Sequence, residues 1–171
     1  AQLVYRAVAL LRHRERYRFD PMDGTPLTYA DSGEYATGES GHQVFPRIDP
    51  AVIGIVEHAE SQRILLGSNA TRPEYFSLVA GYVSVGETLE QAFVREVMEE
   101  TGRRVADVRY VSSQPWPLGS SLMMGFHGYS TDLDAIAPTD GELAEVRWLS
   151  APEILDGVVK LAPAGSIAHH L

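Results

Sequence analysis

The alternation of apolar and polar residues divides the chain into an N-terminal helix, a loop-rich segment and a compact region of strands and helices. Residues 1–18 place apolar side chains at helical spacing, which predicts a helix. Residues 19–47 are rich in Gly, Asp, Ser and Thr, so loops should dominate there. We therefore predict two domains, residues 1–47 and residues 48–171. The basic end of the first helix carries Arg12, Arg14, Arg16 and Arg18.

From residue 50 onward, short runs rich in β-branched and aromatic residues alternate with turn signals. They predict strands at 51–57, 63–68, 75–83, 108–113, 121–130 and 144–150. A helix is expected over about 88–101, because Thr88 and Gln91 form a capping box and Gly102 is a C-terminal stop. A second capping box predicts a short helix from residue 150. Strands mixed with helices, without internal repeats, indicate an α/β fold.

The composition excludes several classes of protein. The 171 residues include no cysteine, so disulfide scaffolds, thiolate zinc sites, iron–sulfur clusters and cysteine nucleophiles are ruled out. No apolar run approaches the ~20 residues of a membrane span, and the start has no signal-peptide pattern. We therefore expect a soluble cytoplasmic protein with no membrane partner. The chain opens with Ala1, which suggests a trimmed piece of a longer gene product.

Three acidic residues gather in the last two turns of the helix expected at 88–101. At ~100° per residue, Glu96, Glu99 and Glu100 fall on one face. Like charges four residues apart and anions near a helix C-terminus both destabilise a helix, by roughly 0.2–1 kcal/mol each. A hard divalent cation, Mg²⁺ or Mn²⁺, would offset this repulsion. A solvated acidic face is the alternative that the charge cluster alone leaves open.

The spacing around these acids favours the metal site over the solvated face. It follows the pattern G-x5-E-x7-R-E-U-x-E-E-x-G-U, in which U is a bulky apolar residue, and it resembles the signature of the Nudix hydrolases. With ~7% usage per residue type, the seven fixed letters match by chance at roughly 10⁻⁸ per starting point. Only Arg103 departs, at a position where an apolar residue is usual. The matching residues are Gly81, Glu87, Arg95, Glu96, Val97, Glu99, Glu100 and Gly102.

The resemblance implies an α/β/α sandwich around a mixed sheet, and metal-dependent hydrolysis of a nucleoside diphosphate linked to another group. It implies catalytic roles for Glu87, Arg95, Glu96, Glu99 and Glu100. Metal ligands would be Glu96, Glu99, Glu100 and Glu142, together with the carbonyl oxygen of Gly81 or Ala80. Which glutamate is the general base stays open, as does the number of metal ions. We expect Arg95 to pair with Glu87 or a ligand glutamate and to fix its orientation.

A second motif indicates one branch of the family. Residues 113–121 are SQPWPLGSS, which resembles the SQPWPFPxS marker of the NADH pyrophosphatase branch, with departures at Leu118 and Gly119. The segments RAVALLRHRERYRF, FPRIDPAVI and ELAEVRW also resemble that branch, so the likeness covers nearly the whole chain. It implies a homodimer in which Phe45 of one subunit reaches the site of the other. It also implies substrate contacts by Tyr82, Phe45, Gln114, Trp116, Ser121 and Ala168.

Members of this branch carry two C-x-x-C pairs between the first helix and the FPR segment. At the corresponding positions this chain has Asp20, Asp23, Thr37 and Ser40. Two carboxylates and two hydroxyls do not reproduce tetrahedral thiolate binding, so we expect a degenerate zinc-ribbon-like segment with no structural zinc. Residues 19–45 should then be held by packing and be among the more mobile parts of the chain.

The resemblance implies hydrolysis of NADH or NAD⁺ to nicotinamide mononucleotide and AMP, and removal of NAD caps from RNA. The preference among these three substrates stays open. Two alternatives also stay open, namely a diphosphatase acting on ADP-ribose or another nucleoside diphosphate derivative, and a non-catalytic nucleotide-binding Nudix module. No G-x-G-x-x-G follows a strand, so a Rossmann dehydrogenase is not supported.

The charge of the chain gives limited support for RNA as a partner. The formal net charge of −9 argues against broad affinity for phosphate backbones. The four arginines of the first helix could hold RNA, but a solvated or dimer-facing basic helix is the favoured interpretation. The six histidines show no metal-ligand spacing and are expected to serve packing or surface roles.

Overall fold

The computed structural model describes residues 2–171, which form two compact units. The units consist of the chain up to Asp49 with Pro115–Leu122, and of Pro50–Gln114 with Met123–Leu171. The segment 115–122 therefore groups with the N-terminal residues rather than with its sequence neighbours. The domain boundary expected at residues 47–48 stays a prediction. Within the described residues, no helix is long and apolar enough to cross a membrane.

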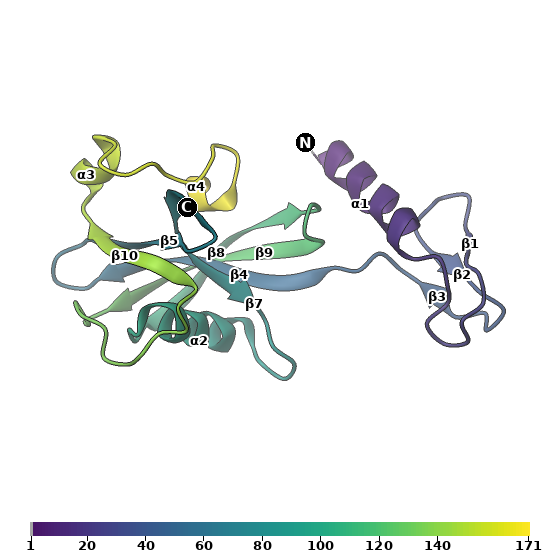
Figure 1. Cartoon of the computed structure of the whole chain (residues 1–171), viewed down its shortest axis with the longest axis horizontal. Coiled ribbons are helices and arrows are strands. Elements are labelled where there is room, and N and C mark those ends of the chain that lie inside the picture. The colour runs from purple at the N-terminus through teal and green to yellow at the C-terminus, as the bar shows by residue number, and fades with distance from the viewer. Residues whose placement is uncertain (1) are drawn as a thin grey trace. The chain divides into compact units, whose positions relative to one another are not determined.

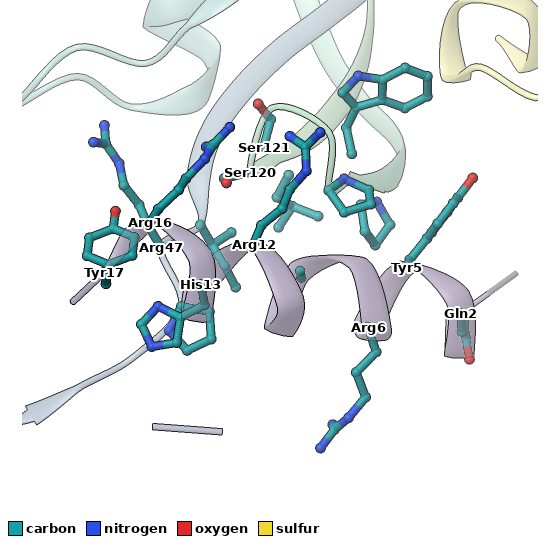
Figure 2. A pocket seen from close by; sticks show the side chains of 17 residues that line it. Gln2, Tyr5, Arg6, Arg12, His13, Arg16, Tyr17, Arg47, Ser120 and Ser121 are labelled. Atoms are coloured by element: carbon teal, nitrogen blue, oxygen red, sulfur yellow. The ribbon is translucent and has the colours of Figure 1, made fainter. Parts of the chain in front are cut away.

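The first unit contains one long helix and a small sheet (Figure 1). Helix α1 spans Gln2–Arg16, as the apolar spacing predicts. The antiparallel sheet has the order β1-β2-β3 and consists of β1 (Thr28–Tyr29), β2 (Ala36–Thr37) and β3 (Gln43–Val44). A cavity lies between α1 and the segment 115–122 (Figure 2).

The buried side chain of His13 connects α1 to the small sheet. Its Nε2 atom lies 3.2 Å from the carbonyl oxygen of Val44, and its ring contacts the rings of Tyr17 and Tyr29. The Tyr29 hydroxyl donates to the carbonyl oxygens of His13 and Tyr17, at 3.0 and 2.6 Å. The last turn of α1 is therefore held on the sheet by both packing and hydrogen bonds.

Hydrogen bonds also hold the two turns in which the related branch has its cysteine pairs. The buried carboxylate of Asp20 accepts from the Met22 amide at 2.8 Å and from the Ser40 hydroxyl at 2.5 Å. The Asp23 carboxylate accepts from the amide and the hydroxyl of Thr25, at 2.8 and 2.6 Å. These are turns in which a side chain binds the backbone two residues on. The bond between Asp20 and Ser40 connects the first turn to the second.

The second unit is built on a seven-stranded mixed sheet. The main order is β10-β5-β4-β9-β8, with β6 beside β5 and β7 beside β4. All pairs that involve β5 or β7 are antiparallel, whereas β4 and β9 run in the same direction. Hydrogen bonds from the Asp49 amide to the Ser120 carbonyl and from the Ala59 amide to the Ser130 carbonyl join like ends of β4 and β9. The strands are β4 (Asp49–His58), β5 (Ile64–Asn69), β6 (Arg72–Ser77), β7 (Val79–Tyr82), β8 (Ala106–Trp116), β9 (Ser121–Ser130) and β10 (Leu143–Leu149).

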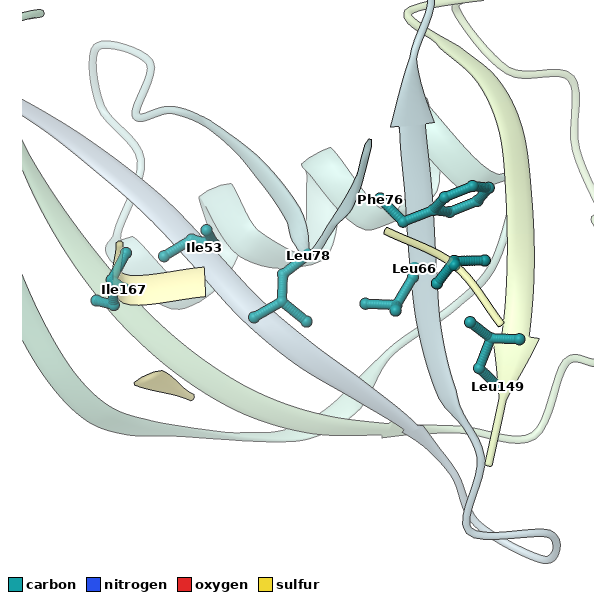
Figure 3. Close-up of a cluster of buried hydrophobic side chains, with 7 residues drawn as sticks. Ile53, Leu66, Phe76, Leu78, Leu149 and Ile167 are labelled. Carbon is teal, nitrogen blue, oxygen red and sulfur yellow. The ribbon is translucent and has the colours of Figure 1, made fainter. Parts of the chain in front are cut away.

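Helices cover both faces of this sheet (Figure 1). Helix α2 (Leu89–Thr101) lies on one face, while α3 (Ala151–Leu155) and α4 (Ile167–His170) lie on the other. The sandwich that the resemblance implies is thereby confirmed. On the α3 and α4 face, Figure 3 shows the buried cluster of Ile53, Leu66, Phe76, Leu78, Leu149 and Ile167, to which Val159 also belongs.

The α2 face of the sheet is packed through aromatic rings. Phe93 of α2 stacks on Phe126 of β9 with ring centroids 5.7 Å apart, and both side chains are fully buried. A Cβ atom on Gly54 of β4 would come within 2.6 Å of the Phe93 ring, so only glycine lets α2 approach this closely. This close packing sets the distance between α2 and the sheet.

The single strand predicted at 75–83 is two strands in the structure. Strand β6 pairs with β5, and β7 pairs with β4, so the chain changes its neighbour at Leu78. Leu78 is buried in the core cluster, and an apolar run does not distinguish such a change of partner from a continuous strand. The change brings Gly81 and Tyr82 beside α2. Helix α4 was not predicted, because its four residues are too few to show periodicity.

Candidate active site

Local sequence signals fix both ends of the acidic helix. The Thr88 hydroxyl accepts from the Gln91 amide, and the Gln91 side chain accepts from the Thr88 amide, which is the predicted capping box. At the other end Gly102 has φ of +66°, and its amide donates to the Met98 carbonyl at 2.8 Å. The acids of the last two turns are therefore presented on a helix of defined length.

The expected ion pair between Arg95 and Glu87 ties the loop before α2 to the helix. Nε and Nη2 of Arg95 donate to the two oxygens of Glu87 at 2.6 and 3.0 Å. Glu87 also accepts from the Ser84 amide at 2.9 Å, and Arg95 donates to the Tyr82 carbonyl at 2.9 Å. The Arg95 guanidinium holds the pKa of Glu87 below its usual value, with help from the Ser84 amide. The loop is thus fixed by charge-assisted bonds.

The same arginine also contacts two acids of the helix face. Nη1 of Arg95 lies 2.8 Å from a carboxylate oxygen of Glu96 and 2.8 Å from one of Glu99. Glu96 is packed against Gly81, where an added Cβ would fall 2.0 Å from the Glu96 carboxyl carbon. Burial raises the pKa of Glu96 despite its contact with Arg95. Glu99 differs in being open to water, since its side chain is 49% exposed.

Glu100 is the most deeply buried acid of the cluster. It is only 3% exposed, and it lines a cavity of about 120 Å³ together with Glu142 and Ala80. Burial raises the pKa of Glu100 to about 8, and the negative charges of Glu142 and Glu96 add to the effect. None of the ion pairs found in residues 2–171 includes Glu100. A buried carboxyl among other carboxylates is the donor set that a hard divalent cation prefers.

The side chain of Glu142 is held from the opposite side of this cavity. Its oxygen Oε1 accepts from the Asn69 side-chain amide at 3.1 Å, and its backbone amide donates to Asp140 at 2.9 Å. The Asp140 amide in turn donates to the Glu99 carbonyl at 2.9 Å, which fastens this loop to the end of α2. The charge of Asp140 also contributes to the raised pKa of Glu100. Sequence analysis did not single out Asp140, although its position two residues before Glu142 was a usable signal.

The acids lie close together but are not arranged around one point. Over the described part of the chain, no three acidic or histidine side chains are placed so as to hold a metal ion. The physical reason is the guanidinium of Arg95, which draws oxygens of Glu96 and Glu99 toward itself, while Glu100 lines the cavity with Glu142. The donor chemistry fits a divalent cation, but its assembly requires these side chains to reorient.

A second cavity, of about 420 Å³, lies between β8 and the residues around α4. Gln114 lines it, and its side-chain amide donates to the Gly165 carbonyl at 2.8 Å. The Gln114 Oε1 and Ser112 Oγ atoms are buried and have no hydrogen-bond partner in the described chain. Ala168 of α4 packs against the neighbouring core. Unsatisfied buried polar atoms beside a cavity favour a polar ligand that completes their hydrogen bonds.

The residues expected to contact substrate are divided between the two units. Gln114, Ala168 and the exposed ring of Tyr82 belong to the second unit, which also carries the acids. In the first unit, Phe45 is 56% exposed and contacts the ring of Tyr35. Trp116 and the buried Ser121 also belong to the first unit, where they line the cavity beside α1.

Arg103, the one departure from the signature, has contacts that replace apolar packing. Its guanidinium donates to the Thr101 carbonyl at 2.7 Å and to the Leu133 carbonyl at 2.9 and 3.1 Å. It also lies 5.9 Å from the ring centroid of Trp148. Arg103 therefore ties the end of α2 to the following loop by hydrogen bonds.

Comparison with known protein families gives one match that covers most of the chain. Residues 47–168 match the family model described as NUDIX domain. Among solved structures, a NUDIX hydrolase from Nitrosomonas europaea superposes with a TM-score of 0.63 at 26% identity and covers 80% of each chain. The match and the superposition agree with the sandwich described above.

Curated relatives are similar along nearly the whole chain. A protein named NAD-capped RNA hydrolase NudC, from Mycobacterium tuberculosis, is 44% identical over 156 residues, or 90% of this chain and 50% of the relative. One named NAD-capped RNA hydrolase NUDT12, from Homo sapiens, is 34% identical over 188 residues, or 100% of this chain and 40% of the relative. The chain thus spans about half the length of the curated relatives it matches, or less.

Proposed function

The chain belongs to the Nudix family, and we propose that it hydrolyses the pyrophosphate of NADH or NAD⁺ to nicotinamide mononucleotide and AMP. The observation that carries this proposal is the buried Glu100 among four further acids, near the end of a helix that bears three of the four signature acids. The names of the relatives from Mycobacterium tuberculosis and Homo sapiens support NAD as the substrate group. They also support the removal of NAD caps from RNA as a second reaction of the same site.

Mg²⁺ or Mn²⁺ is the cofactor that this donor set fits. The ion would be held by Glu96, Glu99, Glu100 and Glu142, with the carbonyl oxygen of Gly81 or Ala80. When bound, the cation neutralises negative charge on the pyrophosphate and makes water more acidic. Its own charge also lowers the pKa of Glu100 and so relieves the cost of burying that carboxylate.

The side chains around the acids have distinct roles in this proposal. Arg95 is a positioning residue, because its bonds to Glu87 and Tyr82 fix the loop and its bonds to Glu96 and Glu99 orient both carboxylates. Glu99 is the most accessible acid of the face, and it either joins the ligands of the ion or takes the proton of the attacking water. Water oxygen bonds to one phosphorus, the bridging P–O bond breaks, and both products leave as phosphate monoesters.

Aromatic and amide groups would bind the rest of the dinucleotide. The exposed ring of Tyr82 is adjacent to the Arg95 site and can stack on a planar base. The cavity lined by Gln114 has two unpaired polar atoms, which suit the donors of an adenine or a carboxamide, and we assign Ala168 of the adjoining helix α4 to the same substrate group. We assign Trp116 and Ser121 to substrate contacts as well, and Phe45 to the site of a partner subunit in a homodimer.

Parallel turnover assays on NADH, NAD⁺ and ADP-ribose with Mg²⁺ or Mn²⁺ test this function. We expect AMP release from NADH or NAD⁺ to exceed that from ADP-ribose, and Glu99→Gln to lower kcat by about 10²-fold or more. Glu90→Gln, an exposed acid in the first turn of the same helix, is the matched control and should stay within about twofold of the wild type.

Two results would contradict the proposal in different ways. Preferred cleavage of ADP-ribose would refute the substrate and leave the metal chemistry intact. No AMP release by the wild-type protein with either metal and any of the three substrates would indicate a non-catalytic nucleotide-binding module instead.

A further inference from the structure

The cavity between α1 and the segment 115–122 has a composition unlike the rest of the molecule. It has a volume of about 360 Å³, within the range of small-molecule sites. Four arginines, one histidine and three large aromatic residues line it, and no Asp or Glu of the described chain does. The chain as a whole carries a formal charge of −9, so this cavity is a local basic region in an acidic protein.

The arginines of the cavity differ in how far they are already engaged. In Figure 2 the side chains of Arg12, Arg16 and Arg47 extend to the same side of α1, whereas Arg6 points away from it. Arg12 donates to the Leu118 carbonyl, and Arg47 pairs with Asp49 at 2.5 Å. Arg16 takes part in none of the ion pairs formed by residues 2–171. Within residues 2–171, Arg16 therefore presents a guanidinium without an ion-pair partner at this cavity, beside Arg47, which is paired with Asp49 and interacts with Tyr17.

Aromatic side chains supply the other half of the lining. Tyr5 and Tyr17 come from α1, and Trp116 comes from the facing segment, where Pro115 and Pro117 flank it. Neighbouring prolines restrict the backbone, so the Trp116 ring is displayed at low entropic cost. Aromatic surfaces next to guanidinium groups are the combination that proteins use to bind single-stranded nucleic acids, with bases stacked on rings and phosphates held by arginines.

We propose that this cavity, which includes the substrate contacts assigned above to Trp116 and Ser121, binds a nucleotide of single-stranded RNA, with its base on Tyr5 or Tyr17 and its phosphate at Arg16 and Arg47. The inference rests on the proposed function, because that function supplies an RNA chain attached to the NAD moiety. NAD itself has two phosphates, and in the proposed reaction both flank the bridging oxygen whose bond water breaks beside the acids of α2. Free NADH therefore has no further phosphate for the arginines of the cavity, whereas an RNA chain has one at each nucleotide.

Direct binding of uncapped RNA tests the cavity without any hydrolysis. The probe is a fluorescein-labelled single-stranded RNA of about eight nucleotides, and its anisotropy is measured at several salt concentrations. We expect Arg16→Gln/Arg47→Gln to weaken binding by about tenfold or more and to reduce the slope of log Kd against log salt by ~0.7 for each lost phosphate contact. Tyr5→Leu removes a stacking surface and should weaken binding by about fivefold or more without changing the slope.

Arg14→Gln/Arg18→Gln is the matched control. It removes the same charge, from Arg14 in the last turn of α1 and from Arg18 just after the helix, but neither residue lines the cavity, and Arg14 lies over the ring of Tyr29 at 5.3 Å. Binding should fall by no more than about twofold in this control. Thermal unfolding of each variant, measured beside the wild type, separates loss of binding from loss of folding.

Three results would overturn the proposal. The first is an equal loss of affinity in the two double variants, which would indicate unspecific electrostatic attraction. The second is an affinity for double-stranded RNA equal to that for the single-stranded probe. The third is no binding of the probe by the wild-type protein. The NADH assay on the same preparations keeps the two hypotheses apart. A protein that binds the probe through this cavity but does not hydrolyse NADH would contradict the proposed function and not the cavity.

Discussion

Glu100 is the most deeply buried acid of the site and is surrounded by other acids. Its raised pKa should make the stability of the folded chain depend on pH. Its pKa of about 8 in the folded, metal-free chain lies above the ordinary value of 4.5. The folded state therefore holds a proton that the unfolded state has lost, and stability falls as the pH rises from about 4.5 to about 8. The loss should be on the order of a few kcal/mol.

Glu100→Gln tests this effect, because glutamine keeps the shape of the side chain and carries no charge. In chelator, the thermal midpoint of the variant should decline less than that of the wild type between pH 5 and pH 8, roughly the interval between the two pKa values. Glu90→Gln should keep the wild-type decline, since Glu90 is exposed. Identical declines in Glu100→Gln and the wild type would show that another group causes the dependence.

Gly81 offers a test of how accurately the acids must be placed. A Cβ at this position would lie 2.0 Å from the Glu96 carboxyl carbon, so Gly81→Ala must push that carboxylate aside. A displacement of about 1 Å in a catalytic group can cost about 10²-fold in rate, and we expect a loss of kcat of that order. Gly125→Ala is the control, because the added atom meets the end of the Leu171 side chain at 3.0 Å and the Ser112 carbonyl oxygen at 3.2 Å, but none of the acids. Full activity in Gly81→Ala would mean that Glu96 is not required where it stands.

At the scale of single residues, spacing predicted which acids come together but not how they are oriented. The ion pair between Arg95 and Glu87 forms as expected. Pairing of Arg95 with a ligand glutamate was expected only as the alternative to Glu87, whereas Arg95 also contacts Glu96 and Glu99. Spacing does not show that one guanidinium serves all three acids, because side-chain rotamers on one helix face are set by tertiary packing. The catalytic and metal-binding roles of these residues stay predictions.

At the scale of the elements, the turns at Asp20 and Ser40 of the first unit are joined by hydrogen bonds, at positions where the related branch has cysteines. Asp20 is buried and accepts from two donors, so Asp20→Ala leaves the Ser40 hydroxyl and the Met22 amide without this partner. The expected loss is about 1–3 kcal/mol in the free energy of unfolding, measured by urea denaturation. Asp31→Ala, an exposed acid of the same unit, should change it by less than about 0.5 kcal/mol.

A chelator provides the complementary measurement on the same unit. If hydrogen bonds alone hold the turns at Asp20 and Ser40, a zinc chelator leaves the urea midpoint of the wild-type protein unchanged. A midpoint that falls on chelation and recovers with added zinc would show that the segment binds metal after all.

The elements that could be predicted were those with strong local signals. The capping box and the final glycine gave the bounds of α2, and the apolar spacing gave α1. The break between β6 and β7 was missed, because the choice of strand partner at Leu78 depends on residues far away in the sequence. The grouping of 115–122 with the N-terminal residues was missed for the same reason.

For the whole molecule, the proposed homodimer makes a prediction about mixed subunits. If Phe45 of one subunit serves the site of the other, Phe45→Ala and Glu99→Gln subunits complement each other. A dimer with one subunit of each kind then contains one intact site. Random pairing of the two in equal amounts should restore about a quarter of the wild-type NADH turnover.

Co-expression of the two variants with different affinity tags allows the mixed dimer to be isolated and assayed. Each variant alone should be nearly inactive. A mixed dimer as inactive as either parent would mean that Phe45 acts only within its own chain, and a purely monomeric wild-type protein would remove the premise.

The route of the chain between the two units has a consequence for any attempt to separate them. Because the connection from β8 to β9 belongs to the first unit, the backbone crosses between the units after residues 49, 114 and 122. Cutting the chain once, at the first crossing, therefore does not release an intact catalytic piece. The excised fragment would keep residues 115–122 without the N-terminal residues of the same unit, so Leu122 and more of the already exposed Trp116 ring would face water. Such a fragment should aggregate in solution.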